Sequence, residues 1–231
     1  MYLPVPADTA AARAEQLLQT ADGDPWAGAD IVIPLSQIYA YAGRFADARG
    51  TIARAWSVHD RSGAKSRWAL CAGLAGHIEQ IAGDPPAAEH HLQEAYQALR
   101  AIGEQGFLST VAGMLAEALY AQGRLGEARQ MTEEAQAAAA PDDVDAHTRW
   151  RAARAKILAR GGQFPAAQAL LDEAAALVLP TSWATFQAQI LMTRAEASLR
   201  ASLPAGTPPR SPTRPRPPST ALPATPAPSL P

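Results

Sequence analysis

A short glycine-centred phrase occurs four times along the chain, and it limits the fold more than any other sequence feature. Its glycines are Gly43, Gly83, Gly123 and Gly162, spaced by 40, 40 and 39 residues. Self-similarity at a fixed period of this length is the signature of a repeat protein. We therefore predict one structural unit used several times.

The repeated unit reads as a pair of helices. Apolar residues before each glycine follow helical spacing, as with Leu115 and Leu119 before Gly123. Glycine tolerates the left-handed backbone that ends a helix. After each glycine, two alanines lie seven residues apart, on one face of the next helix, where small side chains let a neighbouring helix approach. These pairs are Ala48 with Ala55, Ala88 with Ala95, Ala128 with Ala135, and Ala167 with Ala174.

Bulky apolar residues lie between the two alanines of three pairs: Ile52, Leu92 and Leu171. The third repeat has Thr132 at this position, which is a weaker match. Polar breaks separate the helix pairs, and Asp142 or Asp143 can cap the helix after the third break. No strand-like alternation interrupts the order of helix, glycine turn, helix and polar break.

A single helix pair cannot bury its apolar face alone, so the units must stack on one another. We expect an all-α, right-handed superhelical solenoid of antiparallel helix pairs. The predicted segments are an N-terminal segment with a partial repeat helix at 1–27, helix pairs at 28–62, 63–104, 105–141 and 142–180, a partial unit at 181–202, and a tail at 203–231.

The tail holds 11 of the 20 prolines. Proline lacks the backbone N–H and clashes inside helices, so we predict a disordered or polyproline-like segment. Two motifs of the PxxP kind, at 209–212 and 212–215, are of the type that aromatic grooves bind. The alternative, which we favour, is solvated proline-rich sequence without a recognition role.

The spacing from turn glycine to turn aromatic, Phe45 or Phe164, and then to the paired alanines resembles the tetratricopeptide repeat. Phrases at 107–112, 115–124, 140–145 and 154–160 are similar to the C-terminal repeat region of bacterial adenylate/guanylate cyclase-like proteins that also carry an AAA-type ATPase domain. That resemblance implies cyclase and ATPase domains upstream, which this chain lacks. It also implies a further repeat, so we expect a truncated or frame-shifted relative that has lost its last helix.

Charge and composition argue against several classes of function. The formal net charge is -2, from 20 basic and 22 acidic residues, so we expect no direct binding to nucleic acid. The N-terminus lacks the features of a secretory signal, and no apolar run is long enough to span a membrane, so we expect a cytoplasmic protein. The single cysteine, Cys71, lies in an apolar run and is expected to be buried.

No catalytic or cofactor motif is recognisable. The sequence Gly63-Ala64-Lys65-Ser66 lacks the glycine that precedes the lysine of a phosphate-binding loop. His90 and Glu94 share a helix face, which we interpret as an exposed polar stripe, with metal binding as the alternative. His59 should lie near a helix C-terminus, where a cation is favourable. We expect a protein that is not an enzyme and needs no cofactor.

Counting back from the turn glycines predicts which residues face a groove along the first helices. The carboxylate-binding members of the tetratricopeptide class carry a lysine ten positions before the glycine, where this chain has Ile33, Gly73, Gly113 and Ala152, so we reject that type of ligand. The predicted groove residues are Gln37, His77, Gln80, Glu117, Tyr120, Arg149 and Lys156.

These features predict a non-catalytic scaffold that binds a peptide or a domain of a partner protein in the groove. The alternative, implied by the resemblance, is a regulatory repeat fragment of a multidomain nucleotidyl cyclase or ATPase signalling protein. In that case the partner would be an ATPase or cyclase module.

Overall fold

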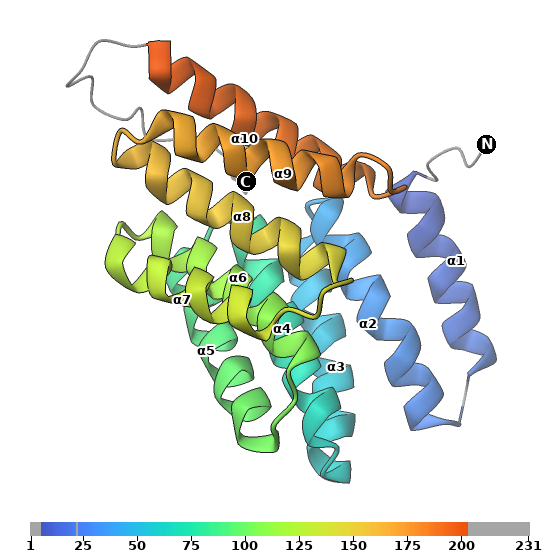
Figure 1. Cartoon of the computed structure of the whole chain (residues 1–231). Helices are drawn as coiled ribbons and strands as arrows, with labels where there is room; N and C mark the ends of the chain where they lie inside the picture. Colours follow the sequence, from blue (N-terminus) through green and yellow to red (C-terminus); the bar gives the residue numbers. More distant parts are fainter. Residues whose placement is uncertain (1–5, 22, 203–231) are drawn as a thin grey trace, which may run out of the picture. The chain divides into compact units, whose positions relative to one another are not determined.

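The computed structural model describes residues 6–21 and 23–202, and this part of the chain is all-helical, without a strand (Figure 1). The predicted tail, 203–231, lies outside the described residues. The helices are α1 (Ala7–Thr20), α2 (Pro25–Tyr41), α3 (Phe45–Ser62), α4 (Lys65–Ala82), α5 (Pro85–Ile102), α6 (Gly106–Ala121), α7 (Leu125–Ala138), α8 (Val144–Arg160), α9 (Phe164–Val178) and α10 (Ala184–Ser202).

Tight glycine turns join the two helices of each pair. The four turn glycines have φ angles between 75° and 80°, a region that residues with a Cβ rarely adopt. In the second turn, Asp84 accepts a hydrogen bond from the backbone N–H of Ala87 at 3.1 Å, and Pro85 opens α5. Asp143 caps α8 in the same way, through the N–H of Ala146 at 2.9 Å. The predicted helix pairs are confirmed.

Small side chains let the helices of each pair pack closely. All eight alanines of the four pairs are fully buried, at 0% exposure. Leu92 fills the space between two of them and is likewise buried. Thr132, the weaker match, is also buried. Its hydroxyl donates to the carbonyl of Arg129 and accepts from Nε of Arg154, so this polar side chain has its hydrogen bonds made.

The first helices of successive pairs, α2, α4, α6 and α8, contact one another and form what we call the inner layer. The second helices, α3, α5, α7 and α9, form the outer layer. The first three of these each contact the first helices on both sides. Each pair therefore completes its core with the next pair, as a stacked repeat requires.

Two glycines set the spacing within the inner layer. A Cβ at Gly73 would lie 3.0 Å from the ring of Phe107, and one at Gly113 would lie 3.1 Å from Cβ of Arg149. Both glycines occupy the position ten residues before a turn glycine, where the sequence has no lysine. The structure gives the reason, because a neighbouring inner helix packs against that position and leaves no room for a long side chain.

Single helices pack against the two end pairs. At one end, α1 packs on α2, and the hydroxyl of Tyr39 donates to the carboxylate of Glu15. At the other end, Ile190 of α10 is buried among apolar residues of α8 and α9, and Arg194 forms an ion pair with Asp172 at 2.7 Å. Helix α10 thus occupies the place of a fifth inner helix.

Two buried side chains differ in how well their sequence context predicted them. Cys71 is fully buried, as expected, and burial raises the pKa of its thiol to about 11. His59 lies in the last turn of α3, as predicted, but it is not a cation there. Its ring is fully buried against Trp26, and burial, helped by the charge of Arg67, lowers the pKa. His59 is therefore neutral rather than a cation at the helix end.

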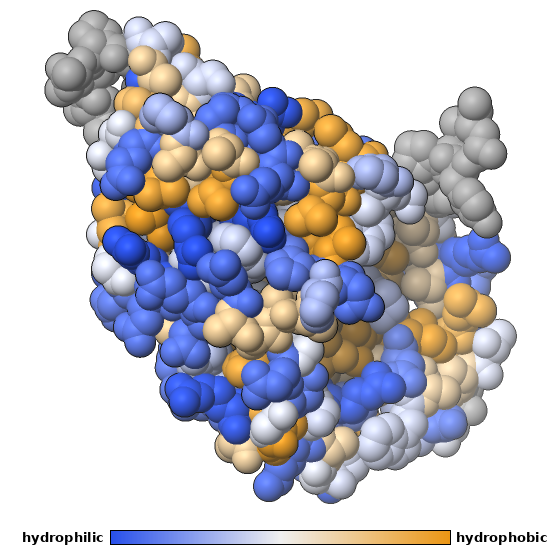
Figure 2. Space-filling view, viewed as in Figure 1, coloured by the Kyte–Doolittle hydropathy of each residue, from blue (hydrophilic) through white to orange (hydrophobic). Residues whose placement is uncertain are grey.

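The described helices include none that is long and apolar enough to cross a membrane. The face drawn in Figure 2 carries small apolar patches scattered among hydrophilic side chains, without a continuous apolar belt. Exposed large apolar side chains among the described residues include Tyr41, Trp183 and Met192.

Candidate binding groove

A groove with a volume of about 340 Å³ runs along the inner layer, and we call it the inner groove. Four inner helices and α10 contribute side chains to it, from Tyr41 on α2 to Phe186 on α10. Each inner helix presents its free face there, because its other faces pack on neighbours in the stack. The groove is therefore a direct consequence of stacking helix pairs side by side.

His77 lies in the inner groove as a neutral hydrogen-bonding group. Its Nδ1 is 2.9 Å from the amide oxygen of Gln37, which can only accept, so Nδ1 carries the hydrogen and Nε2 is left as an acceptor. Burial, together with the nearby charge of Arg149, lowers the pKa of His77 to about 3. The ring of Tyr41 meets the imidazole edge-on, with 6.0 Å between ring centroids.

Arg149 forms one wall of the groove and is held from three sides. Its Nε donates to both carboxylate oxygens of Asp145 at 3.0 Å, and its guanidinium lies 4.5 Å from the centre of the Phe186 ring. Its Cβ packs against Gly113 of α6. The charge of this arginine is thus neutralised within its own helix, and its position is fixed by cation–π contact and close packing.

Lys156 and Glu117 connect α8 to α6 across the inner layer. The lysine Nζ donates to both carboxylate oxygens, at 2.8 and 3.0 Å, and both side chains are about four-fifths buried. Burial disfavours the charged lysine, but the charge and hydrogen bonds of Glu117 outweigh this and raise its pKa. The pair is charged, and it joins two repeats.

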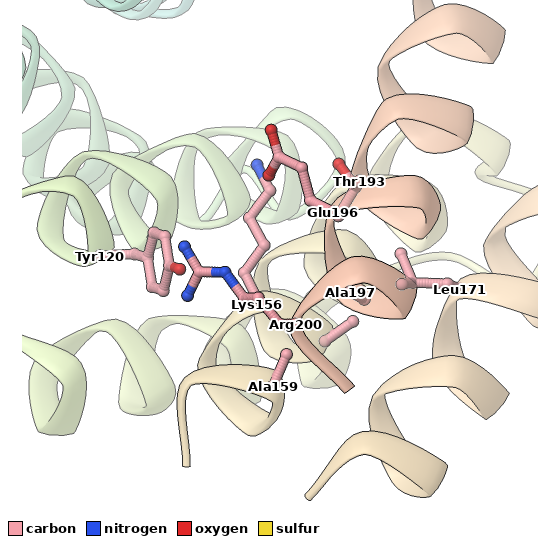
Figure 3. A pocket seen from close by; sticks show the side chains of 9 residues that line it. Tyr120, Lys156, Ala159, Leu171, Thr193, Glu196, Ala197 and Arg200 are labelled. Carbon is pink, nitrogen blue, oxygen red and sulfur yellow. The ribbon is translucent and has the colours of Figure 1, made fainter. Parts of the chain in front are cut away.

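A second, small pocket of about 20 Å³ lies beside this ion pair (Figure 3). Tyr120 of α6, Lys156 of α8 and Glu196 of α10 line it from three different helices. Its volume is close to that of one water molecule, so it is too small for a peptide side chain. The inner groove is the larger candidate site.

The structure divides the predicted groove residues into three groups. Four of them, His77, Gln80, Glu117 and Arg149, line the inner groove. Tyr120 and Lys156 line the small pocket instead. Gln37 lines neither. Its amide oxygen hydrogen-bonds to His77, and its amide nitrogen donates to the carbonyl of Leu74 at 3.4 Å.

Several of these residues use their polar atoms to join repeats. Gln80 of α4 donates to the carbonyl of Met114 on α6 at 2.8 Å, and Gln37 of α2 reaches Leu74 on α4. Four of the seven predicted residues line the groove, but counting back from the glycine could not distinguish a residue open to a partner from one that bridges two helices.

Sequence reasoning missed Tyr41, Thr148 and Phe186, which all line the groove. Tyr41 lies only two residues before its turn glycine, at a position that the counting did not sample. Phe186 belongs to α10, which is not followed by the glycine phrase, so no reference point was available for it. The hydroxyl of Thr148 is buried and has no hydrogen-bond partner within the described residues.

The charges of the inner groove are internally balanced. Arg149 is paired with Asp145, and Glu117 with Lys156. Among the described residues, the groups left to bind a partner include the acceptor Nε2 of His77, the hydroxyl and ring of exposed Tyr41, and the amide of Gln189. The only cluster of three metal-type ligands within 6–21 and 23–202 is on α5, outside this groove.

Comparison with solved structures supports the architecture. The crystal structure of BtubC (BKLC) from P. vanneervenii is similar, with a TM-score of 0.58 and 18% sequence identity over 89% of this chain and 78% of that chain. No model of a known family and no curated protein matches the chain. At this identity the structural match shows a helical repeat-like fold alone. Membership of the tetratricopeptide class, and the resemblance to cyclase-like ATPase regulators, stay predictions.

Proposed function

We propose that this chain is a non-catalytic interaction scaffold that binds a peptide or a domain of another protein in the inner groove. The observation that carries the proposal is a groove of about 340 Å³ to which the four inner helices and α10 all contribute side chains. Such a volume lies at the lower end of those that bind ligands, and a stacked repeat extends it along one face.

The balance of charge in the groove favours an uncharged stretch of peptide. A charged partner would need an unpaired counter-charge, whereas Arg149 and Lys156 already have carboxylate partners. Backbone N–H groups of a peptide can donate to Nε2 of His77, and apolar side chains can pack on the exposed ring of Tyr41. An aromatic anchor of this kind is typical of residues that dominate binding energy.

A paired set of surface variants tests this placement. The groove variant combines Tyr41→Ala with Gln189→Ala, and the control combines Arg129→Ala with Glu133→Ala on the exposed face of α7. Affinity purification with mass spectrometry would identify partners of the unaltered chain, and titration calorimetry would measure their affinity. We expect the groove variant to bind at least about tenfold more weakly and the control to bind normally. Equal binding by both variants would contradict the proposal that partners bind in the inner groove.

A further inference from the structure

Three potential metal ligands converge on the outer layer, at α5. Nε2 of His90 lies 3.9 Å from a carboxylate oxygen of Glu94, and Nδ1 of His91 lies 3.5 Å from the same oxygen. All three ligand atoms are within 4.8 Å of one another. The sequence pairs His90 with Glu94 at a spacing of four residues, and the structure adds His91, three residues before Glu94.

Packing beneath the cluster holds one of the three ligands in place. The His91 ring meets Trp56 of α3 edge-on at 5.6 Å between centroids, and Trp56 in turn meets Trp68 of α4 at 5.3 Å. This stack orients the imidazole so that Nδ1 faces Glu94. His90 and Glu94 are more exposed, with 68% and 40% of their side chains accessible, and can adjust.

One nitrogen of the cluster, Nδ1 of His91, lacks a hydrogen-bond partner among the described residues. Nδ1 of His91 is shielded from solvent and makes no hydrogen bond within the described residues. A shielded polar nitrogen without a partner is unfavourable, because it has lost its hydration without compensation. A cation bound between His91 and Glu94 would satisfy that nitrogen and would also neutralise the carboxylate.

The donor set selects the class of cation. Two imidazole nitrogens and one carboxylate oxygen suit zinc and the neighbouring late first-row divalent ions, whereas magnesium and calcium prefer oxygen alone. Bonds of about 2.0–2.1 Å at tetrahedral angles place ligand atoms about 3.3 Å apart. The present separations from Glu94 are longer, at 3.5 and 3.9 Å, and the three ligand atoms lie within 4.8 Å of one another, so rotation of the two exposed side chains must shorten them.

We propose that His90, His91 and Glu94 form a binding site for a divalent cation of the zinc type on the outer layer, separate from the inner groove. Three protein ligands leave a fourth coordination position for water or for a ligand from another molecule. None of the three side chains lines the groove, so this site is independent of the proposed scaffold function.

Zinc chloride titrated into the full chain without a histidine tag tests the proposal by calorimetry. We expect binding at one ion per chain, weakened at least about tenfold by His90→Ala and by Glu94→Gln. Both residues are exposed enough for these variants to fold, which circular dichroism would verify. Gln93→Ala, an exposed neighbour on the same helix, is the matched control and should bind normally.

A second readout uses the tryptophan beneath the site. Copper(II) bound at His91 would quench the fluorescence of Trp56, so quenching should fall in a Trp56→Phe variant and in His90→Ala. Absence of one-to-one zinc binding at micromolar concentrations would overturn the proposal. So would zinc affinity that is unchanged in both His90→Ala and Glu94→Gln.

Discussion

The inner and outer layers of this repeat protein use different means to hold their helices together. Outer helices pack through paired alanines that are fully buried, and the charged pair of Arg129 with Glu133 on α7 is exposed. Inner helices meet one another across Gly73 and Gly113 and are joined by largely buried polar groups. The alanine contacts of the outer helices thus depend on shape, whereas the contacts between inner helices combine shape with polar bridges.

This difference explains why the groove forms where it does. Alanine faces can be fully buried because both surfaces are apolar and complementary in size. The inner helices expose one face to solvent, and polar side chains there can both bridge repeats and remain partly accessible. A partner therefore meets polar side chains that are already oriented, such as His77, rather than mobile ones.

Acidification should produce the largest effect, and it tests one buried histidine in each layer. Since burial lowers the pKa of His77 to about 3, its stabilising contribution is complete above the unfolded value of 6.5 and is lost as pH falls toward 3. At pH 5 this amounts to a loss of about 2 kcal/mol. His59 of the outer layer, whose pKa is also lowered, acts in the same direction.

Denaturant unfolding of the His77→Gln and His59→Phe variants at pH 7 and pH 5 would separate the two contributions. Each variant should lose less stability on acidification than the unaltered chain does. If neither substitution reduced the loss of stability at pH 5, the two histidines would not be responsible for the acid sensitivity.

Removing an ion pair should cost more stability in the inner layer than in the outer layer, and both losses should be smaller than the effect of acidification. Lys156→Met leaves Glu117 as a largely buried charge without its partner, and we expect a loss of about 1–2 kcal/mol. Arg129→Ala removes an exposed pair from α7, with an expected loss of about 0.3 kcal/mol. Urea midpoints at unchanged m-value would measure both.

The double variant Glu117→Gln with Lys156→Met completes the cycle and should recover part of the loss, because no unpaired charge remains. Losses of equal size for Lys156→Met and Arg129→Ala would show that the inner pair contributes no more than a surface pair.

Two glycine substitutions should have the smallest effects, with opposite signs. A Cβ at Gly76 of α4 would lie 2.5 Å from Cγ of Leu92 on α5, so Gly76→Ala forces repacking and should cost about 1 kcal/mol even after its gain in helix propensity. Gly50 in α3 has no such neighbour within 4 Å, and Gly50→Ala should stabilise by about 0.5–1 kcal/mol. Thermal midpoints of the two variants should move in opposite directions, and a rise for Gly76→Ala would contradict the close contact.

Much of the candidate site could be anticipated from the sequence, within a clear physical limit. Counting from the turn glycines placed His77, Gln80, Glu117 and Arg149 on the groove side, because helical periodicity fixes the direction of a side chain around its own axis. Periodicity carries no information on what a side chain meets in the next helix. The bridging role of Lys156 therefore could not be predicted, and neither could the packing of His91 against Trp56.

The sequence by itself determined the all-helical repeat, since turn glycines and alanine pairs are local signals that recur at a fixed period. Only the tertiary structure decided which inner-face residues are open and which bind a neighbouring repeat, and that His59 is buried and neutral. Those outcomes depend on distances between helices that are far apart in the chain, and such distances are set by the packing of whole surfaces.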